Sequence, residues 1–130
     1  MAKLPSKHQA VLLTGTAQRD LSAVMAWSER EFGERAALRY DALIKQALKD
    51  IGDDPECPGS KHRPELMIEN ARTYHLKFSR TRVIGSRVKA PTHFLLYRLR
   101  EDGVVEVGRI LHDHRDLERH LPEDYRSTES

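Results

Sequence analysis

The sequence comprises 130 residues, of which 38% are hydrophobic and 32% charged, and its formal net charge is +2. This length fits one domain with a modest core, and the charge is too small to indicate nucleic-acid binding by itself. No apolar run approaches the roughly 20 residues of a membrane-spanning helix, the N-terminus lacks a signal-peptide stretch, and the single cysteine, Cys57, cannot form an internal disulfide, so a reduced cytoplasmic protein is expected.

The first half of the chain predicts a strand followed by two helices. A short apolar run over residues 8–14 is typical of a strand. Thr16 is predicted to cap the first helix, whose apolar residues recur every three or four positions up to a break at Gly33. A second such stripe over residues 34–51 ends at Gly52, with a proline shortly beyond. Two long helices separated by one glycine predict an antiparallel helix hairpin.

In the second half the hydrophobic period changes to two, which predicts strands. Residues 73–79 alternate between apolar and polar side chains, and residues 92–99 form a more continuous apolar run that is typical of a central strand. A hairpin turn is expected at residues 101–103, where glycine favours positive φ, and residues 104–111 form the returning strand. A short helix over residues 116–121 should end before the following proline.

Together these elements predict an α+β fold: an N-terminal strand, an antiparallel helix hairpin on a small, mostly antiparallel sheet, and a short C-terminal helix. We expect an N-terminal tail over residues 1–7, one domain over residues 8–121, and a polar C-terminal tail over residues 122–130. The helix hairpin can cover one face of the sheet, and nothing in the sequence is left to cover the other. Such an uncovered face, with apolar and basic positions, predicts a partner-binding surface.

Several segments, taken in order and spacing, resemble the RelE/ParE superfamily of toxins from bacterial type II toxin–antitoxin systems. They are Ala-Gln-Arg-Asp-Leu at 17–21, Phe-Gly-Glu at 32–34, Phe-Leu-Leu-Tyr-Arg at 94–98, and Val-Gly-Arg-Ile-Leu-His-Asp-His-Arg-Asp-Leu at 107–117. The last of these is the most specific. The resemblance is closer to ParE than to RelE, and it implies the α/β fold of the superfamily, growth inhibition, and a cognate ParD-like antitoxin.

The resemblance leaves three activities open. ParE-like members poison DNA gyrase and are not known as enzymes, whereas RelE-like members are endonucleases that cut mRNA in the ribosomal A site. A third alternative is an inactive member that serves only as a binding partner. We favour the gyrase poison, because no complete set of nuclease residues is visible in the sequence, and we expect no cofactor.

One segment departs from the commonest ParE pattern. Residues 80–91, the basic arm, stand where the family often has only a few residues, and the sequence from Lys77 to Lys89 contains no carboxylate. Its cations are expected to neutralise phosphates of a gyrase–DNA complex or of ribosomal RNA. Alternatively, they solubilise a flexible hairpin and protect an exposed edge. The residues predicted to contact the target are Arg80, Arg82, Arg87, Lys89, Arg109 and Arg115.

A nuclease would need a base, an acid and cations that hold the phosphate. The residues that could supply them are His112, His114, Arg98 and Arg109. The alternative interpretation is structural: Arg109 pairs with a carboxylate such as Glu106 or Asp116, and His112 caps the short C-terminal helix. No metal site is expected, because the possible ligands are scattered and a closed site needs three or four.

The antitoxin is expected to be a small protein whose C-terminal segment is disordered alone and folds along the helix hairpin and the sheet, because coupled folding lets a partner wrap a large surface. The residues predicted to lie under it are Leu21, Met25, Trp27 and Lys77.

Overall fold

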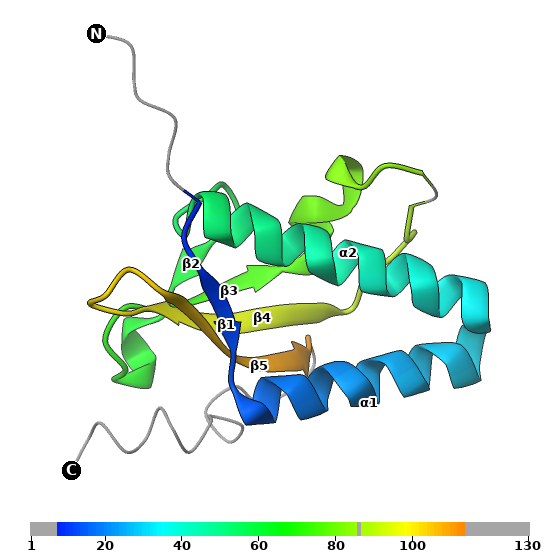
Figure 1. Ribbon diagram of the computed structural model, residues 1–130, viewed down its shortest axis with the longest axis horizontal. Helices are drawn as coiled ribbons and strands as arrows, with labels where there is room; N and C mark the ends of the chain where they lie inside the picture. Colours follow the sequence, from blue (N-terminus) through cyan, green and yellow to red (C-terminus); the bar gives the residue numbers. More distant parts are fainter. Residues whose placement is uncertain (1–7, 86, 114–130) are drawn as a thin grey trace, which may run out of the picture.

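The computed structural model describes residues 8–85 and 87–113, and these form two helices packed on a five-stranded mixed sheet (Figure 1). The sheet order is β1-β5-β4-β3-β2, with β1 parallel to β5 and all other neighbours antiparallel. The elements are β1 (Val11–Leu13), α1 (Gly15–Phe32), α2 (Glu34–Asp53), β2 (Lys61–His62), the 3₁₀ helix η1 (Pro64–Leu66), β3 (Ala71–His75), the 3₁₀ helix η2 (Leu76–Arg82), β4 (His93–Leu99) and β5 (Val105–His112).

The predicted α+β fold is confirmed, including the N-terminal strand, the helix hairpin and the mostly antiparallel sheet. The hairpin turns at Gly33, whose backbone has φ +93°. Residues other than glycine rarely adopt this conformation. The predicted turn at residues 101–103 is also present, with Gly103 at φ +85°. The predicted C-terminal helix over residues 116–121 lies outside the described residues, as do the two predicted tails.

The N-cap prediction was wrong by two residues. Thr14, not Thr16, precedes α1, and its hydroxyl accepts the backbone N–H of Ala17 at 3.1 Å. The same hydroxyl donates to the carbonyl of Gly108 on β5 at 3.1 Å, and the Thr14 N–H donates to Val107 at 3.0 Å. Thr14 therefore both starts the helix and fixes it to the last described strand, so the cap is chosen by a tertiary contact as well as by local propensity.

α1 and α2 run antiparallel and pack on one face of the sheet (Figure 1). Side chains from both helices and from three strands form the main core, which includes the fully buried Leu43, Ile51, Leu95, Tyr97 and Val107. The opposite face was expected to be bare, and this is only partly so. The segment around η1 folds over it and buries a smaller cluster, made of Leu66, Ile68, Ala71 and Leu96.

The strand predicted over residues 73–79 is another correction. β3 ends at His75, and residues 76–82 form η2. The His75 side chain causes this change locally, because its Nδ1 accepts the Lys77 backbone N–H at 3.0 Å and replaces a strand hydrogen bond. Leu76 and Ser79 remain buried although the alternation has stopped. Phe78, which alternation assigned to the same face as Leu76, is instead 44% exposed.

Candidate functional site

Three histidines meet at one end of the sheet, which we call the histidine end. β3 finishes at His75, β4 begins at His93 and β5 finishes at His112, and these strands are neighbours. The register places His93 opposite His112 and His75 opposite Phe94. The sheet therefore gathers residues that are 18 or 19 positions apart in the chain, and the basic arm leaves the sheet from the same end.

His93 is buried in an aromatic cluster at this end. Its Nδ1 lies 2.6 Å from the hydroxyl of Tyr40, which also accepts the Thr92 backbone N–H at 3.1 Å. The ring of Trp27 packs edge-on against both Tyr40 and His93. Burial, with a smaller contribution from the nearby charge of His112, lowers the pKa of His93 to about 4. His93 is therefore neutral near pH 7, and its role is to join α1, α2 and β4.

A carboxylate joins the other two histidines. The Nδ1 of His75 accepts a backbone N–H, so its Nε2 carries the proton and donates to Asp113 Oδ2 at 3.1 Å. His112 Nδ1 lies 3.4 Å from the other carboxylate oxygen of Asp113. Both ring nitrogens of His75 are thus occupied, and Asp113 links the ends of β3 and β5 across β4.

Arg109 is held by a carboxylate, as the structural interpretation expected, but the partner is Asp20 on α1. The guanidinium donates from Nε at 2.7 Å and from Nη2 at 3.2 Å, each to a different Asp20 oxygen. Asp20 also accepts the backbone N–H of Ile110 at 3.0 Å. Asp20 therefore occupies the edge of β5 just beyond β1, which pairs with residues 105–107 alone. The expected partners of Arg109 were Glu106 and Asp116, and Glu106 instead pairs with Arg98 at 2.8 Å.

The residues of the nuclease hypothesis are brought together only in part, since Arg109 and His112 lie on the same stretch of β5 but Arg98 is remote from them. Arg98 lies five residues along β4 from His93, and His93 stands opposite His112, so Arg98 and His112 are roughly 16 Å apart along the sheet. Arg98 and Arg109 each have a carboxylate partner. His114 and Arg115 lie outside the described residues. Within residues 8–85 and 87–113, no group of three His, Cys, Asp or Glu side chains is placed to hold a metal ion.

A groove of about 500 Å³ runs between α1 and the end of β5. Trp27 and Arg30 line it from the helix, and Arg109 and His112 line it from the strand. Of the residues predicted to contact an antitoxin, Trp27 thus lies in a groove beside a strand edge. Leu21 and Met25 are half-buried and pack against the main core, and Lys77 is exposed, with its Nζ 5.2 Å from the centre of the Phe78 ring.

The cations of the basic arm fall into two kinds. Arg80 and Arg82 are engaged within the molecule, because Arg80 Nε donates to the carbonyl of Val88 at 2.6 Å and Arg82 Nε lies 3.6 Å from Asp50. Arg87 and Lys89 are exposed on the returning half of the arm. The sequence alone predicts the same target-binding role for all four residues, whereas the structure shows internal partners for the first two and exposed side chains for Arg87 and Lys89.

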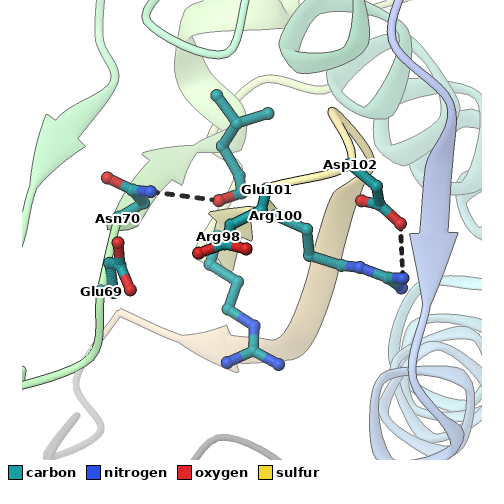
Figure 2. A pocket seen from close by; sticks show the side chains of 7 residues that line it. Glu69, Asn70, Arg98, Arg100, Glu101 and Asp102 are labelled. Carbon is teal, nitrogen blue, oxygen red and sulfur yellow. Dashed lines mark hydrogen bonds and ion pairs between the residues drawn. The ribbon is translucent and has the colours of Figure 1, made fainter.

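The opposite end of the sheet, which we call the turn end, carries a smaller pocket of about 320 Å³ beside the β4–β5 hairpin (Figure 2). Both of its arginines have carboxylate partners: Arg100 Nη2 donates to Asp102 at 2.7 Å, and Arg98 pairs with Glu106. Asn70 holds its wall by donating to the Leu99 carbonyl at 3.3 Å. Paired charges of this kind stabilise a hairpin, and with Glu69 and Glu101 also beside the pocket there is no excess of positive charge to attract an anionic target.

Sequence reasoning missed Tyr40, His75, His93, Asp20 and Asp113. The histidines could have been found from the predicted strand order, since antiparallel neighbours place the end of one strand beside the start of the next. Asp20 stands inside the motif at residues 17–21, but its partner Arg109 is 89 residues away. Nothing in the local sequence connects them.

Comparison with known proteins defines the class. Among solved structures, the chain is similar to one described as a chromosomal ParDE toxin–antitoxin system from P. aeruginosa, with a TM-score of 0.57 and 17% sequence identity over 81% of this chain and 96% of the other. At this identity the likeness establishes the fold. No match was found among curated protein sequences.

The family follows from the sequence itself. Residues 11–117 match the model for the ParE toxin of type II toxin–antitoxin system, parDE. The chain therefore belongs to the ParE toxin family and is a ParE-type toxin of a toxin–antitoxin system. In the described part of the chain, neither helix is long and apolar enough to cross a membrane.

Proposed function

We propose that this protein inhibits growth by poisoning DNA gyrase in the cytoplasm and is neutralised by a ParD-like antitoxin. The observation that carries the proposal is that both arginines of the nuclease hypothesis are engaged by carboxylates and that Arg98 is remote from His112. Arg109 is engaged bidentately by Asp20, and Arg98 pairs with Glu106 roughly 16 Å from His112. General acid–base cleavage needs convergent groups, whereas a poison acts by binding. Family membership supplies the toxin class.

The target surface is proposed at the histidine end, where the basic arm projects beside α2 (Figure 1). Arg87 and Lys89, exposed on the returning half of the arm, supply the contacts with an anionic target. Arg80 and Arg82 act indirectly, by holding the arm. Arg109, also predicted to bind the target, is held beside Asp20 on the α1 side of the same end.

A gyrase assay tests the target. Purified protein added to gyrase and relaxed plasmid should inhibit supercoiling and should accumulate cleaved DNA when the reaction is stopped with detergent. Leu12→Ala is the control variant and should act as wild type does. It changes an exposed residue on β1, at the edge of the sheet far from β3 in the strand order. Supercoiling and cleavage that remain unchanged at high molar excess of toxin would refute the proposal.

Primer extension on cellular mRNA after induction separates the alternative activity. Specific in-frame cuts, with gyrase unaffected, would indicate the endonuclease instead. Expression without any antitoxin that leaves growth unchanged would indicate an inactive member.

The antitoxin is proposed to fold along the groove between α1 and β5, over Trp27 and toward Lys77. Leu21 and Met25 contribute less directly, since they are half-buried against the core. Trp27 is the single tryptophan of the chain, so its fluorescence reports docking when the antitoxin has none. Its emission should shift on binding, and Trp27→Ala should weaken the complex by at least tenfold, because buried aromatic anchors dominate such interfaces. Unchanged emission and affinity would place the antitoxin elsewhere.

A further inference from the structure

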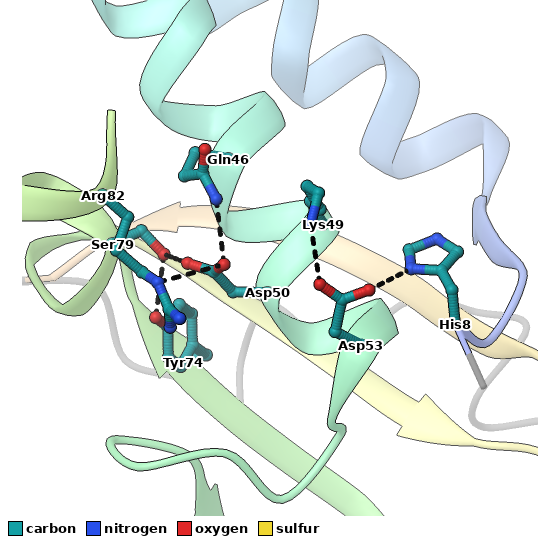
Figure 3. A network of polar contacts seen from close by, with 8 residues as sticks. All are labelled: His8, Gln46, Lys49, Asp50, Asp53, Tyr74, Ser79 and Arg82. Atoms are coloured by element: carbon teal, nitrogen blue, oxygen red, sulfur yellow. Dashed lines mark hydrogen bonds and ion pairs between the residues drawn. The ribbon is translucent and has the colours of Figure 1, made fainter. Parts of the chain in front are cut away.

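The basic arm is anchored to the body of the protein through a buried polar network (Figure 3). Asp50 on α2, 5% exposed, accepts the Ser79 hydroxyl at 2.6 Å and the Gln46 amide at 2.9 Å. The Tyr74 hydroxyl lies 2.8 Å from the same Ser79 oxygen. Arg82 completes the network from its exposed side. The segment that leads into the arm is therefore fixed to α2 by the Ser79–Asp50 hydrogen bond and the Arg82–Asp50 ion pair.

The two halves of the arm are also tied to each other. Arg80, on the outgoing half, donates to the Val88 carbonyl on the returning half at 2.6 Å. Val83 and Val88 pack against the main core. These contacts hold both halves against the body, so Ile84 and Gly85, which follow Val83, are the described residues of the projecting tip.

An apolar side chain stands at this tip. Ile84 is 100% exposed, and Gly85 follows it with φ +101°, in open space where an added Cβ would meet nothing within 4 Å. Val83 and Val88, on either side of the tip, pack against the core, whereas Ile84 between them is exposed to solvent. A single exposed apolar residue is common on protein surfaces. Here, however, it occupies the projecting tip of an anchored loop and is flanked by cations.

The charge around Ile84 selects the class of partner. The sequence contains no Asp or Glu between Glu69 and Glu101, and Arg87 and Lys89 are exposed directly after the tip. The acid that contacts the arm, Asp50, is buried and engaged by Ser79. A polyanion is the complementary surface. Among polyanions, duplex DNA also offers an apolar receptor, because isoleucine and similar side chains can enter between base pairs while arginine and lysine bind the flanking phosphates.

We propose that Ile84 is an apolar wedge that enters a base step of the DNA held by gyrase, with Arg87 and Lys89 on the adjacent phosphates. The inference rests on the proposed function and specifies it. A cleaved or gapped step is the easiest to enter, since less stacking is lost there. A wedge in the cleaved step keeps the broken ends apart, which accounts for trapping by binding alone.

The first experiment uses DNA without gyrase. The probe is a short duplex with a one-nucleotide gap and 2-aminopurine beside it, compared with the same duplex without the gap. Wild-type protein should bind the gapped duplex more tightly, and it should increase 2-aminopurine fluorescence because the base is unstacked. Ile84→Ala should abolish the fluorescence rise and weaken gapped-duplex binding on the order of tenfold, since the wedge loses most of its buried area.

Two further variants separate the wedge from the cations. Arg87→Ala and Lys89→Ala should each lower the slope of log affinity against log salt by about 0.9, as expected for one phosphate contact. Ile84→Ala should leave that slope unchanged. Leu12→Ala, an exposed aliphatic residue on β1, should match wild type throughout. Circular dichroism confirms that each variant is folded, which is expected because all four side chains are exposed.

The second experiment measures trapped cleavage complexes with gyrase. Ile84→Ala should reduce trapping on the order of tenfold, in line with the DNA result. If wild type increases 2-aminopurine fluorescence but does not affect gyrase, the insertion of Ile84 into DNA is supported and gyrase is refuted as the target. If gyrase is trapped equally by Ile84→Ala and wild type, the wedge is overturned. If Ile84→Ala loses affinity for gyrase without DNA and wild type leaves 2-aminopurine unchanged, Ile84 enters a protein pocket and the wedge is likewise overturned.

Discussion

The two ends of the sheet use charged side chains in opposite ways. At the turn end, Arg98, Arg100, Asp102 and Glu106 lie within one hairpin and pair with one another. At the histidine end and at the base of the arm, the acids fix the scaffold: Asp113 joins two strands, Asp20 holds Arg109 on β5, and Asp50 on α2 holds the segment that leads into the arm. The exposed cations of the arm are left without acidic neighbours in the sequence. Where charges pair within one hairpin they stabilise a turn, and where the acids are engaged in holding the scaffold the exposed cations are available for recognition.

The largest effect should come from Asp50. Asp50→Ala removes a buried acceptor from Ser79 and Gln46 and leaves those donors without a partner, so it should lower the free energy of unfolding by about 3 kcal/mol. Urea denaturation measures this. Asp53→Ala is the matched control one turn later on α2, where the carboxylate pairs with Lys49 and His8 at the surface. Equal losses in the two variants would remove the distinction between anchoring and surface acids.

The next effect depends on pH and on His93. The folded pKa of His93 is lowered to about 4, below its unfolded value near 6.5, so the unfolded state binds the proton more readily. Its contribution is fully present above pH 6.5 and is lost as the pH falls toward and below 4, by up to about 3 kcal/mol. Unfolding free energies at several pH values should show this loss in wild type. His93→Gln should lack that part of the pH dependence, and parallel curves for the two proteins would contradict the prediction.

A comparable but smaller loss is expected at Asp20. Asp20→Asn weakens its contacts with Arg109 and with the Ile110 N–H, which should cost about 1.5 kcal/mol in unfolding free energy. It also leaves the Ile110 N–H, at the edge of β5 beside the groove proposed for the antitoxin, with an amide in place of a carboxylate as its acceptor. Chemical denaturation and titration with the antitoxin measure the two consequences. A variant as stable as wild type would show that Asp20 does not fix the histidine end.

The smallest effect is predicted at the turn end. Asp102→Ala removes an exposed pair with Arg100 and a hydrogen bond from the Val104 N–H, and should change stability by about 0.5 kcal/mol. DNA binding should not change, because this end is not proposed to contact the target. A loss as large as that of Asp50→Ala would mean that the two ends are not different in kind.

The sequence was informative wherever the controlling interaction is local. The break at Gly33 and the turn at Gly103 follow from backbone freedom, and the amphipathic stripes follow from periodicity. The strand prediction for residues 73–79 was wrong because a strand and a 3₁₀ helix can both bury Leu76. The deciding contact is a hydrogen bond that the His75 side chain accepts from the Lys77 backbone N–H.

The site depended on interactions that no local pattern carries. Arg80, Arg82, Arg87 and Lys89 look alike in the sequence, yet the first two are engaged by partners on the arm and on α2. The Asp20–Arg109 pair joins residues 89 positions apart. Which cation remains available is a property of the folded chain, because it depends on where the acids come to lie.

The position of β5 has a consequence for when the protein can act. It is the last described strand along the chain, yet it lies inside the sheet between β1 and β4. Val11 therefore cannot form its strand pair until Val105 has been synthesised. During synthesis the helix hairpin and the first strands emerge with their apolar faces uncovered, and contacts between such distant segments form slowly. A ribosome must release almost the whole domain before the sheet closes, so the antitoxin has a period in which to meet a toxin that is not yet folded.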